Sequence, residues 1–225
     1  MGRHSLGIVV PARNEEKTIK NVLTSLKNYG DVLVVDDFST DKTLFLTKNL
    51  KTKYIKNKKK LGYEATTLKG IKYLLKKKYK YIATFDADGE HDPKFLLNIN
   101  KLQNFDLLIG ERKKLNRFSE YFFSYTVNFF FNIRDPLSGL KVYRSKILNQ
   151  INLNYENDFN TNLIFKIRGL NGKIIHKPLN VKKRKDTSRL GNTVKVNLNI
   201  VICLFRLLFK IIIYKLITIK KINKC

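Results

Sequence analysis

Short apolar runs that end abruptly in acidic residues constrain the fold of this chain more than any other feature. The β-prone run 81–85 passes directly into the acidic turn 86–92, and the run 31–35 passes into Asp36 and Asp37. In a β-α protein, acidic side chains at the C-terminal end of a strand point into the crevice where ligands bind. The sequence therefore predicts an acidic ligand site built from strand ends.

The apolar runs alternate with segments of helical periodicity. Strands are expected over 6–10, 31–37, 54–55, 81–85 and 106–109, with intervening helices that end near 29, 50, 75 and 102. Strands this apolar, separated by helices of ten or more residues, indicate a mostly parallel central sheet with flanking helices on both faces. The predicted fold class is α/β.

The acidic turn carries three oxygen ligands, Asp86, Asp88 and Glu90. Carboxylate oxygens suit Mg²⁺ or Mn²⁺, and such an ion is commonly shared with a phosphate of the substrate. The alternative for an isolated Asp-x-Asp pattern is a polar loop that caps the helix expected to begin at Pro93.

The formal net charge of +27 over 225 residues favours anionic partners, which include nucleic acid, an acidic membrane and phosphorylated substrates. An apolar content of 43% excludes wholesale disorder, and the length allows one substantial core. Cys203 and Cys225 have neither zinc-binding spacing nor the pattern of a disulfide framework, and no secretory signal is expected. No helix-turn-helix, zinc or RNA-recognition signature accompanies the charge, so a nucleic-acid-binding protein is a remote alternative and nucleic acid is not an expected partner.

Three motifs lie at expected strand ends: VVPARNEE at 9–16, VVDDFSTD at 34–41 and DADGEHDP at 86–93. In this order and spacing they resemble the family 2 glycosyltransferases, which have the Rossmann-like GT-A fold. The segments DPLSGLKVYR at 135–144 and RKDTSRLG at 184–191 resemble the branch that transfers sugars to dolichyl or other polyprenyl phosphates, the dolichol-phosphate mannose synthase-like enzymes. The resemblance covers roughly 5–191, so a catalytic domain is expected over 1–191.

The resemblance implies a site for a nucleotide sugar linked to UDP or GDP. The residues that would hold the nucleotide are Pro11, Ala12, Arg13, Glu15, Asp36, Asp37 and Asp86. For Asp36 the alternative is a cap on the loop that follows it. Asp86, Asp88 and Glu90 would hold Mg²⁺ or Mn²⁺ across the diphosphate, where the ion neutralises charge on the departing nucleoside diphosphate. A metal-dependent hexosyltransferase is thus implied.

The resemblance also implies an inverting displacement at the anomeric carbon, with Asp135 and Arg112 as catalytic residues. A polyprenyl phosphate is already ionised and needs cations to position it, whereas a hydroxyl acceptor needs a general base. The residues expected to bind the acceptor phosphate are Arg112, Arg184, Ser188 and Arg189. Asp135 would act as a base or orient an arginine, and both roles stay open.

Transfer to a hydroxyl acceptor during cell-surface polysaccharide or glycolipid synthesis is the alternative function. Asn162 lies in a segment where many relatives carry acidic residues. An amide cannot serve as the base, so this substitution weakens the hydroxyl-acceptor alternative.

The second half of the chain is rich in aromatic and basic residues. The segment 118–133 is expected to form a core helix or an interfacial helix beside the acceptor site. The segment 198–218 is long enough to span a bilayer. Its two central charges cost about 5–7 kcal/mol on insertion, and its apolar residues return about 4–8 kcal/mol, so spanning is near break-even.

Polar residues in and just before this segment share one helical stripe. The stripe contains Lys195, Asn199, Arg206 and Lys210. This pattern favours a helix that lies in the membrane interface with its basic side chains toward anionic lipid. A second, membrane-associating domain is therefore expected over 192–225, at the cytoplasmic face of a membrane.

Overall fold

The computed structural model describes residues 5–102, 104–115, 117–154, 159–182, 194 and 197–209. The chain divides into two compact units. The first comprises Met1–Lys113 and Arg134–Lys185, and the second comprises Lys114–Ile133 and Asp186–Cys225. The boundary expected at 191 lies outside the described residues and stays a prediction.

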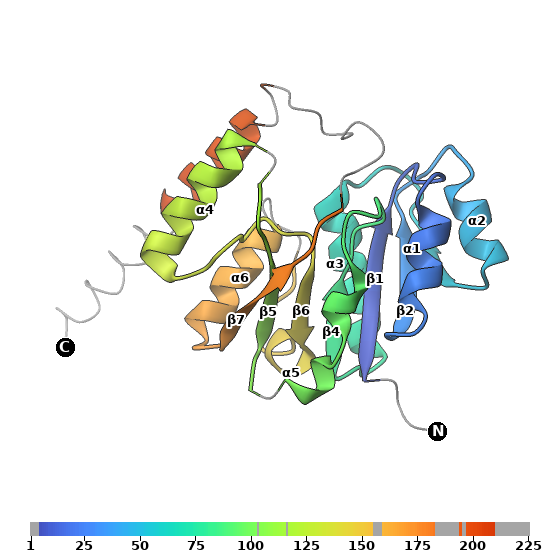
Figure 1. Ribbon diagram of the computed structural model, residues 1–225, viewed down its shortest axis with the longest axis horizontal. Coiled ribbons are helices and arrows are strands. Elements are labelled where there is room, and N and C mark those ends of the chain that lie inside the picture. Colours follow the sequence, from blue (N-terminus) through green and yellow to red (C-terminus); the bar gives the residue numbers. More distant parts are fainter. Residues whose placement is uncertain are drawn as a thin grey trace. The chain divides into compact units, whose positions relative to one another are not determined.

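The first unit is built on a seven-stranded sheet in the order β3-β2-β1-β4-β6-β5-β7 (Figure 1). The strands are β1 (Leu6–Ala12), β2 (Asp31–Asp36), β3 (Lys53–Lys56), β4 (Tyr81–Thr84), β5 (Leu107–Arg112), β6 (Lys141–Arg144) and β7 (Ile174–Leu179). β6 runs antiparallel to β4 and β5, and the other neighbouring strands are parallel. The prediction of a mostly parallel α/β sheet is confirmed.

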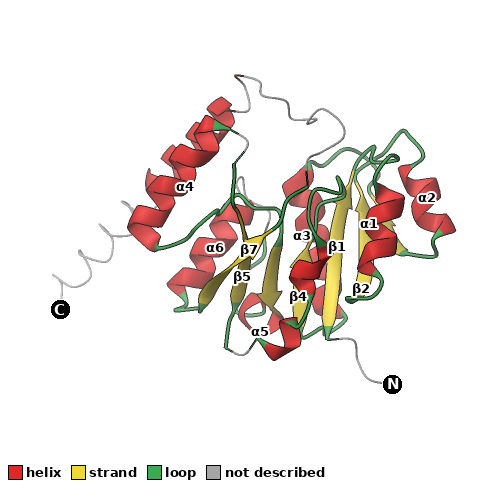
Figure 2. Ribbon diagram, in the orientation of Figure 1, coloured by secondary structure: helices red, strands yellow, loops and turns green. Residues whose placement is uncertain are grey.

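Helices cover both faces of this sheet, as the alternation of side chains along the strands requires (Figure 2). The helices of the first unit are α1 (Ile19–Leu26), α2 (Thr43–Asn49), α3 (Tyr63–Lys76), α5 (Ser145–Leu148) and α6 (Phe159–Gly169). The buried stripe of α1 joins the core formed by Ile8 and Val10 of β1. On the opposite face α3 packs closely on Val9, because a Cβ at Gly70 would collide with the Val9 side chain.

The helix expected over 93–102 is not present as such. Two short 3-10 helices, η1 (Pro93–Leu96) and η2 (Ile99–Lys101), take its place. Leu97 is extended and Asn98 adopts a left-handed backbone with φ of 59°, so the hydrogen-bonding pattern of a continuous helix is interrupted between them.

The order of the strands determines where a ligand can bind. The chain moves from β1 outward to β2 on one side, and β4 adds to β1 on the other side. In open α/β sheets, ligands bind beyond the carboxyl ends of the strands where the strand order reverses. The acidic segments that follow β1, β2 and β4 all lie at this edge.

The second unit contains α4 (Phe118–Phe131) and a helix over 197–209. The two helices lie side by side in Figure 1, and the Ser119 hydroxyl donates a hydrogen bond to Asn197 Oδ1 (2.6 Å). Many of their large apolar side chains are exposed, among them Phe118, Tyr125, Phe129, Phe205 and Phe209. Among the described residues, no helix is both long enough and apolar enough to cross a membrane.

Candidate functional site

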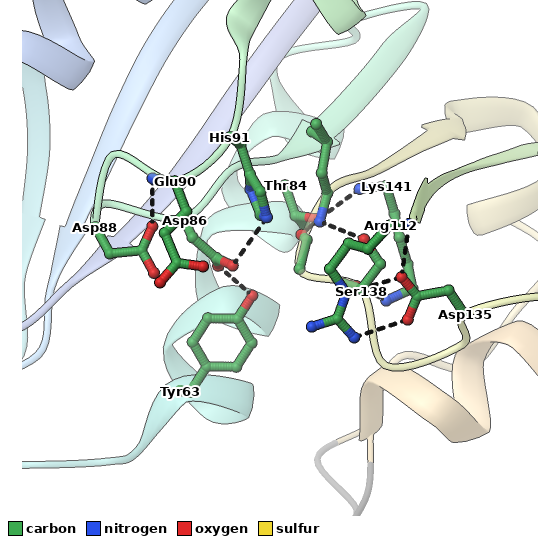
Figure 3. A network of polar contacts seen from close by, with 12 residues as sticks. Tyr63, Thr84, Asp86, Asp88, Glu90, His91, Arg112, Asp135, Ser138 and Lys141 are labelled. Carbon is green, nitrogen blue, oxygen red and sulfur yellow. Dashed lines mark hydrogen bonds and ion pairs between the residues drawn. The ribbon is translucent and has the colours of Figure 1, made fainter. Parts of the chain in front are cut away.

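The acidic turn after β4 presents three carboxylates at the reversal point of the sheet (Figure 3). Asp86, Asp88 and Glu90 are all partly exposed, so each is accessible to a ligand. The Glu90 N–H donates to Asp88 Oδ1 (3.0 Å), which fixes the turn locally. The Asp92 side chain then accepts from Lys94 N–H and caps η1, so the capping role belongs to Asp92.

The carboxylate oxygens of this turn fit a Mg²⁺ or Mn²⁺ ion that is shared with a substrate. Carboxylate oxygens are the ligands these ions prefer, and Mg²⁺ is usually held by one or two carboxylates together with substrate phosphates. Within the part of the chain that the structure describes, no group of three His, Cys, Asp or Glu side chains forms a metal site on its own. A bound ion would therefore be held by some of the predicted side chains, Asp86, Asp88 and Glu90, together with oxygens of a bound substrate.

Asp86 is oriented by residues from two distant segments and by His91 of its own turn. The Tyr63 hydroxyl donates to Asp86 Oδ1 (2.7 Å), and His91 Nε2 lies 3.9 Å from Oδ2. The carboxylate also rests directly against Gly139, where a Cβ would collide with it. Burial of its hydroxyl, followed by the charge of Asp86, raises the pKa of Tyr63 well above its ordinary value, so Tyr63 remains a donor.

Asp37 is buried and is held by the loop that precedes α3. It accepts hydrogen bonds from Leu61 N–H (2.7 Å), Gly62 N–H (2.9 Å) and the Asn57 amide (3.0 Å). The Lys69 ammonium donates to Asn57 Oδ1 (2.7 Å) and so orients that amide. Burial raises the pKa of Asp37, but the hydrogen bonds outweigh burial and leave the pKa below its ordinary value.

The other predicted nucleotide residues lie at the ends of β1 and β2. Pro11 and Ala12 pair with Val35 and Asp36 in the parallel ladder. Arg13 is half-buried, and its Nε is buried without a hydrogen-bond partner among the described residues. The structure therefore brings the predicted PARNEE and VVDD segments together at one edge.

Asp36 and Glu15 are also held locally. Asp36 Oδ2 accepts from Ser39 N–H (3.3 Å), so the alternative of a loop cap describes this oxygen. Its Oδ1 is buried and has no hydrogen-bond partner in the part of the chain that the structure describes. Glu15 Oε2 lies 3.2 Å from the Thr18 hydroxyl, which also donates to the Ala87 carbonyl (2.7 Å). Thr18 thus joins the segment after β1 to the acidic turn.

Asp135 and Arg112 form a bidentate ion pair on the β5–β6 side of the site. Arg112 Nε and Nη2 each donate to one Asp135 oxygen (both 2.8 Å), and the Arg112 N–H donates as well (3.0 Å). Asp135 is only 4% exposed. Because both oxygens accept from Arg112, the geometry favours Asp135 as the residue that orients an arginine over Asp135 as a base.

A second cation, Lys141, is buried beside this pair. Lys141 begins β6, and its ammonium donates to the Ser138 carbonyl. The Thr84 hydroxyl donates to the Gly139 carbonyl (2.7 Å) and so attaches the turn before β6 to the end of β4. Burial lowers the pKa of Lys141 to about 8, an effect that the nearby charges of Asp135 and Asp86 partly offset.

Sequence reasoning missed several residues of this site. They are Asn57, Tyr63, Lys69, Thr84, Gly139 and Lys141. A lysine within the otherwise apolar run 140–143 was a signal that could have been used, whereas Tyr63 had no local signal. The predicted acceptor residues Arg184, Ser188 and Arg189 lie outside the described residues.

Comparisons with known proteins agree with this geometry. The sequence model of Glycosyl transferase family 2 matches residues 7–152. The chain belongs to this family. It is 34% identical over 105 residues to the UDP-N-acetylglucosamine–dolichyl-phosphate N-acetylglucosaminyltransferase of Methanococcus voltae, covering 38% of this chain and 42% of that protein. It is 22% identical over 216 residues to the dolichol-phosphate mannosyltransferase of Pyrococcus furiosus, covering 84% of this chain and 60% of that protein.

The chain therefore spans about half the length of these two curated relatives. Among solved structures it resembles glucosyl-3-phosphoglycerate synthase from Mycobacterium tuberculosis in complex with UDP, with a TM-score of 0.71, 16% identity and coverage of 90% of this chain and 79% of that one. Another structure of that synthase contains Mn²⁺, UDP and glucosyl-3-phosphoglycerate. At this identity the likeness shows the fold, and the predicted GT-A architecture is confirmed.

Proposed function

We propose that this protein is an inverting glycosyltransferase that moves a sugar from a nucleotide sugar to a polyprenyl phosphate at a membrane surface. Family membership supports sugar transfer. The names of two relatives, which act on dolichyl phosphate, support a lipid phosphate as the acceptor. The arrangement of charges at the site supports the division into donor and acceptor sides.

The donor side consists of the carboxylates after β1, β2 and β4. Glu15, Asp36, Asp37 and Asp86 would contact the nucleoside, since carboxylates accept hydrogen bonds from a base edge or from ribose hydroxyls. Asp88 and Glu90 would hold Mg²⁺ or Mn²⁺ at the diphosphate. When bound, the ion supplies positive charge that stabilises the departing nucleoside diphosphate.

The bidentate contact between Asp135 and Arg112 is the observation that carries the proposal. A hydroxyl acceptor requires a carboxylate with a free oxygen to take its proton. Asp135, the candidate for that role, has both oxygens engaged by Arg112. A phosphate acceptor needs no base, and an arginine fixed by a carboxylate is suited to binding it.

The reaction follows from these two sides. An oxygen of the acceptor phosphate attacks the anomeric carbon, the bond from that carbon to the nucleoside diphosphate breaks, and the configuration inverts. Arg112 would hold the attacking phosphate, and Asp135 would keep the guanidinium in place. The acceptor is already ionised, so no proton has to move in this step.

The exposed aromatic face of the second unit supports a membrane surface as the location. Phe118, Tyr125 and Phe129 of α4 are each more than 70% exposed. Exposed aromatic and aliphatic side chains on a helix, combined with a strongly basic chain, are typical of proteins that lie on anionic lipid. We extend the proposal to binding of the lipid surface by α4 and the helix over 197–209.

Sugar transfer into lipid is the direct test. Purified protein is mixed with polyprenyl phosphate, Mn²⁺ or Mg²⁺, and a panel of labelled UDP and GDP sugars. An organic-extractable, acid-labile product from one donor is expected. Product formed only with a hydroxyl acceptor or a soluble phosphorylated acceptor would refute the polyprenyl assignment and leave family membership intact.

Vesicle co-sedimentation tests the membrane surface separately. The double variant Tyr125→Glu with Phe129→Glu should lose most binding to vesicles that contain anionic lipid, because it places charge on the exposed face of α4. Phe45→Glu is the matched control, since Phe45 is 60% exposed on α2 in the other unit. Equal loss of binding in both variants would refute the role of α4.

A further inference from the structure

Asp86 is the carboxylate of the acidic turn whose orientation depends most clearly on residues outside the turn. From outside the turn, Gly139 closes one side of it, and within the turn His91 lies 3.9 Å from Oδ2. The short hydrogen bond, 2.7 Å to Oδ1, comes from the Tyr63 hydroxyl (Figure 3). A hydrogen bond to a charged group contributes more than one between neutral groups, so this contact is the strongest constraint on the carboxylate.

The backbone around Tyr63 is anchored to the nucleotide side of the site. Gly62 has φ of 90°, a backbone conformation that favours glycine. Its N–H donates to Asp37 Oδ2, and the Leu61 N–H donates to Asp37 Oδ1. Tyr63 follows at the first position of α3. The stretch 61–63 therefore contacts Asp37 after β2 through its backbone and Asp86 after β4 through a side chain, across the end of β1.

A third anchor follows immediately. Glu64 accepts hydrogen bonds from Phe159 N–H (3.1 Å) and Asn160 N–H (3.3 Å) at the start of α6. Three consecutive residues, Gly62, Tyr63 and Glu64, thus contact three separate elements. The position of the Tyr63 hydroxyl is fixed by this backbone, as expected for a residue that supports a functional side chain.

Packing does not account for Tyr63. The residue remains 44% exposed, although its hydroxyl is directed at Asp86. A tyrosine retained for burial alone would be enclosed, as Tyr81 and Tyr143 are.

We infer that Tyr63 is a positioning residue for binding of the nucleotide sugar: its hydroxyl holds Asp86 toward the nucleotide and couples that carboxylate to the loop before α3, which holds Asp37. This inference rests on the proposed function for its consequence in catalysis. Without the hydroxyl, the Asp86 carboxylate loses its donor and rotates away from the orientation that meets a nucleoside diphosphate.

Tyr63→Phe is the test, and Tyr79→Phe is its matched control. The Tyr79 hydroxyl donates to Asp31 Oδ2 (2.8 Å) at the opposite end of β2, so the control removes a similar hydrogen bond outside the site. Calorimetry with UDP and with GDP, each with Mn²⁺, should show about tenfold weaker binding by Tyr63→Phe and wild-type binding by Tyr79→Phe. The KM for the donor should rise by a similar factor while kcat changes less.

Two binding results would overturn the inference: unchanged nucleotide affinity in Tyr63→Phe, or the same loss in Tyr79→Phe. A crystal structure of Tyr63→Phe gives a readout that does not need activity, and there the Asp86 carboxylate should leave its present orientation. An unmoved Asp86 would also overturn the inference. Failure of the wild-type protein to bind either nucleotide would refute the proposed function instead, and the crystal structure would still decide whether Tyr63 positions Asp86.

Discussion

The proposed donor and acceptor sides of the site both contain buried or half-buried carboxylates, but they hold them differently. After β2 and β4, Asp37 and Asp86 accept hydrogen bonds from N–H and O–H groups. On the β5–β6 side, Asp135 is paired with Arg112, and the ammonium of Lys141 is buried nearby. A neutral hydrogen-bond donor orients a carboxylate and leaves its charge in place, whereas an ion pair orients the carboxylate and neutralises its charge. The difference suits a cation with its diphosphate on one side and an anionic acceptor on the other.

The largest effect is expected from removing charge on the donor side. Asp88→Asn should lower kcat/KM by about a thousandfold or more, which corresponds to about 4 kcal/mol, because a ligand of the divalent ion is lost. Asp92→Asn is the matched control, since Asp92 lies in the same turn and uses its carboxylate to cap η1. Steady-state kinetics over a range of Mn²⁺ concentrations measures both. Full activity in Asp88→Asn would contradict the metal assignment.

Breaking the ion pair on the acceptor side should also reduce stability. Asp135→Asn should lower the free energy of unfolding by about 3 kcal/mol, because Arg112 keeps its charge in a buried site. Asp106→Asn is the control, because Asp106 directly precedes β5 and its pair with Arg144 of β6 is longer, at 3.9 Å, and more exposed, so a loss below about 1 kcal/mol is expected.

Denaturant unfolding measures these two losses, and the pH–rate profile of Asp135→Asn separates the two roles of Asp135. A residue that orients Arg112 lowers the rate at every pH. Disappearance of the acidic limb of the profile would instead indicate a general base and favour a hydroxyl acceptor.

Lys141 makes the free energy of unfolding of the protein depend on pH in the alkaline range. Its pKa in the folded protein is lowered to about 8, and the unfolded chain titrates near the ordinary value of 10.5. The unfolded state therefore binds more protons between these values, and the free energy of unfolding rises with pH across this window. Relative to Lys141→Met, which cannot titrate there, the wild type should gain on the order of 3 kcal/mol. A difference that stays constant from pH 7.5 to 10.5 would show that the pKa of Lys141 is not lowered in the folded protein.

The smallest expected effect concerns His176 on β7. Burial lowers its pKa, and the neutral ring accepts a hydrogen bond from Arg134 N–H at Nε2 (3.0 Å). A lowered pKa means that this contribution is complete above about pH 6.5 and is lost as the pH falls through the folded value. Acidification through this folded value should thus cost the wild type about 1 kcal/mol that His176→Gln does not lose. Parallel pH dependence of the two proteins would contradict this role.

The sequence predicted much of the fold and part of the site, for a reason that is visible in particular elements. The buried stripe of α1 and the apolar runs of β1, β2 and β4 follow from local periodicity, which depends on neighbouring residues only. The prediction of a continuous helix over 93–102 was wrong because Asn98 adopts a left-handed conformation that the surrounding sequence pattern does not specify.

The sequence by itself determined that acidic segments follow three parallel strands and that Asp86, Asp88 and Glu90 share one turn, because each of these features lies within a few consecutive residues. Only the tertiary structure decided that Tyr63 meets Asp86, that Asp135 pairs with Arg112 and that Lys141 lies beside them. Such contacts join segments far apart in the chain, and their closeness depends on the strand order and on the antiparallel insertion of β6 between β4 and β5.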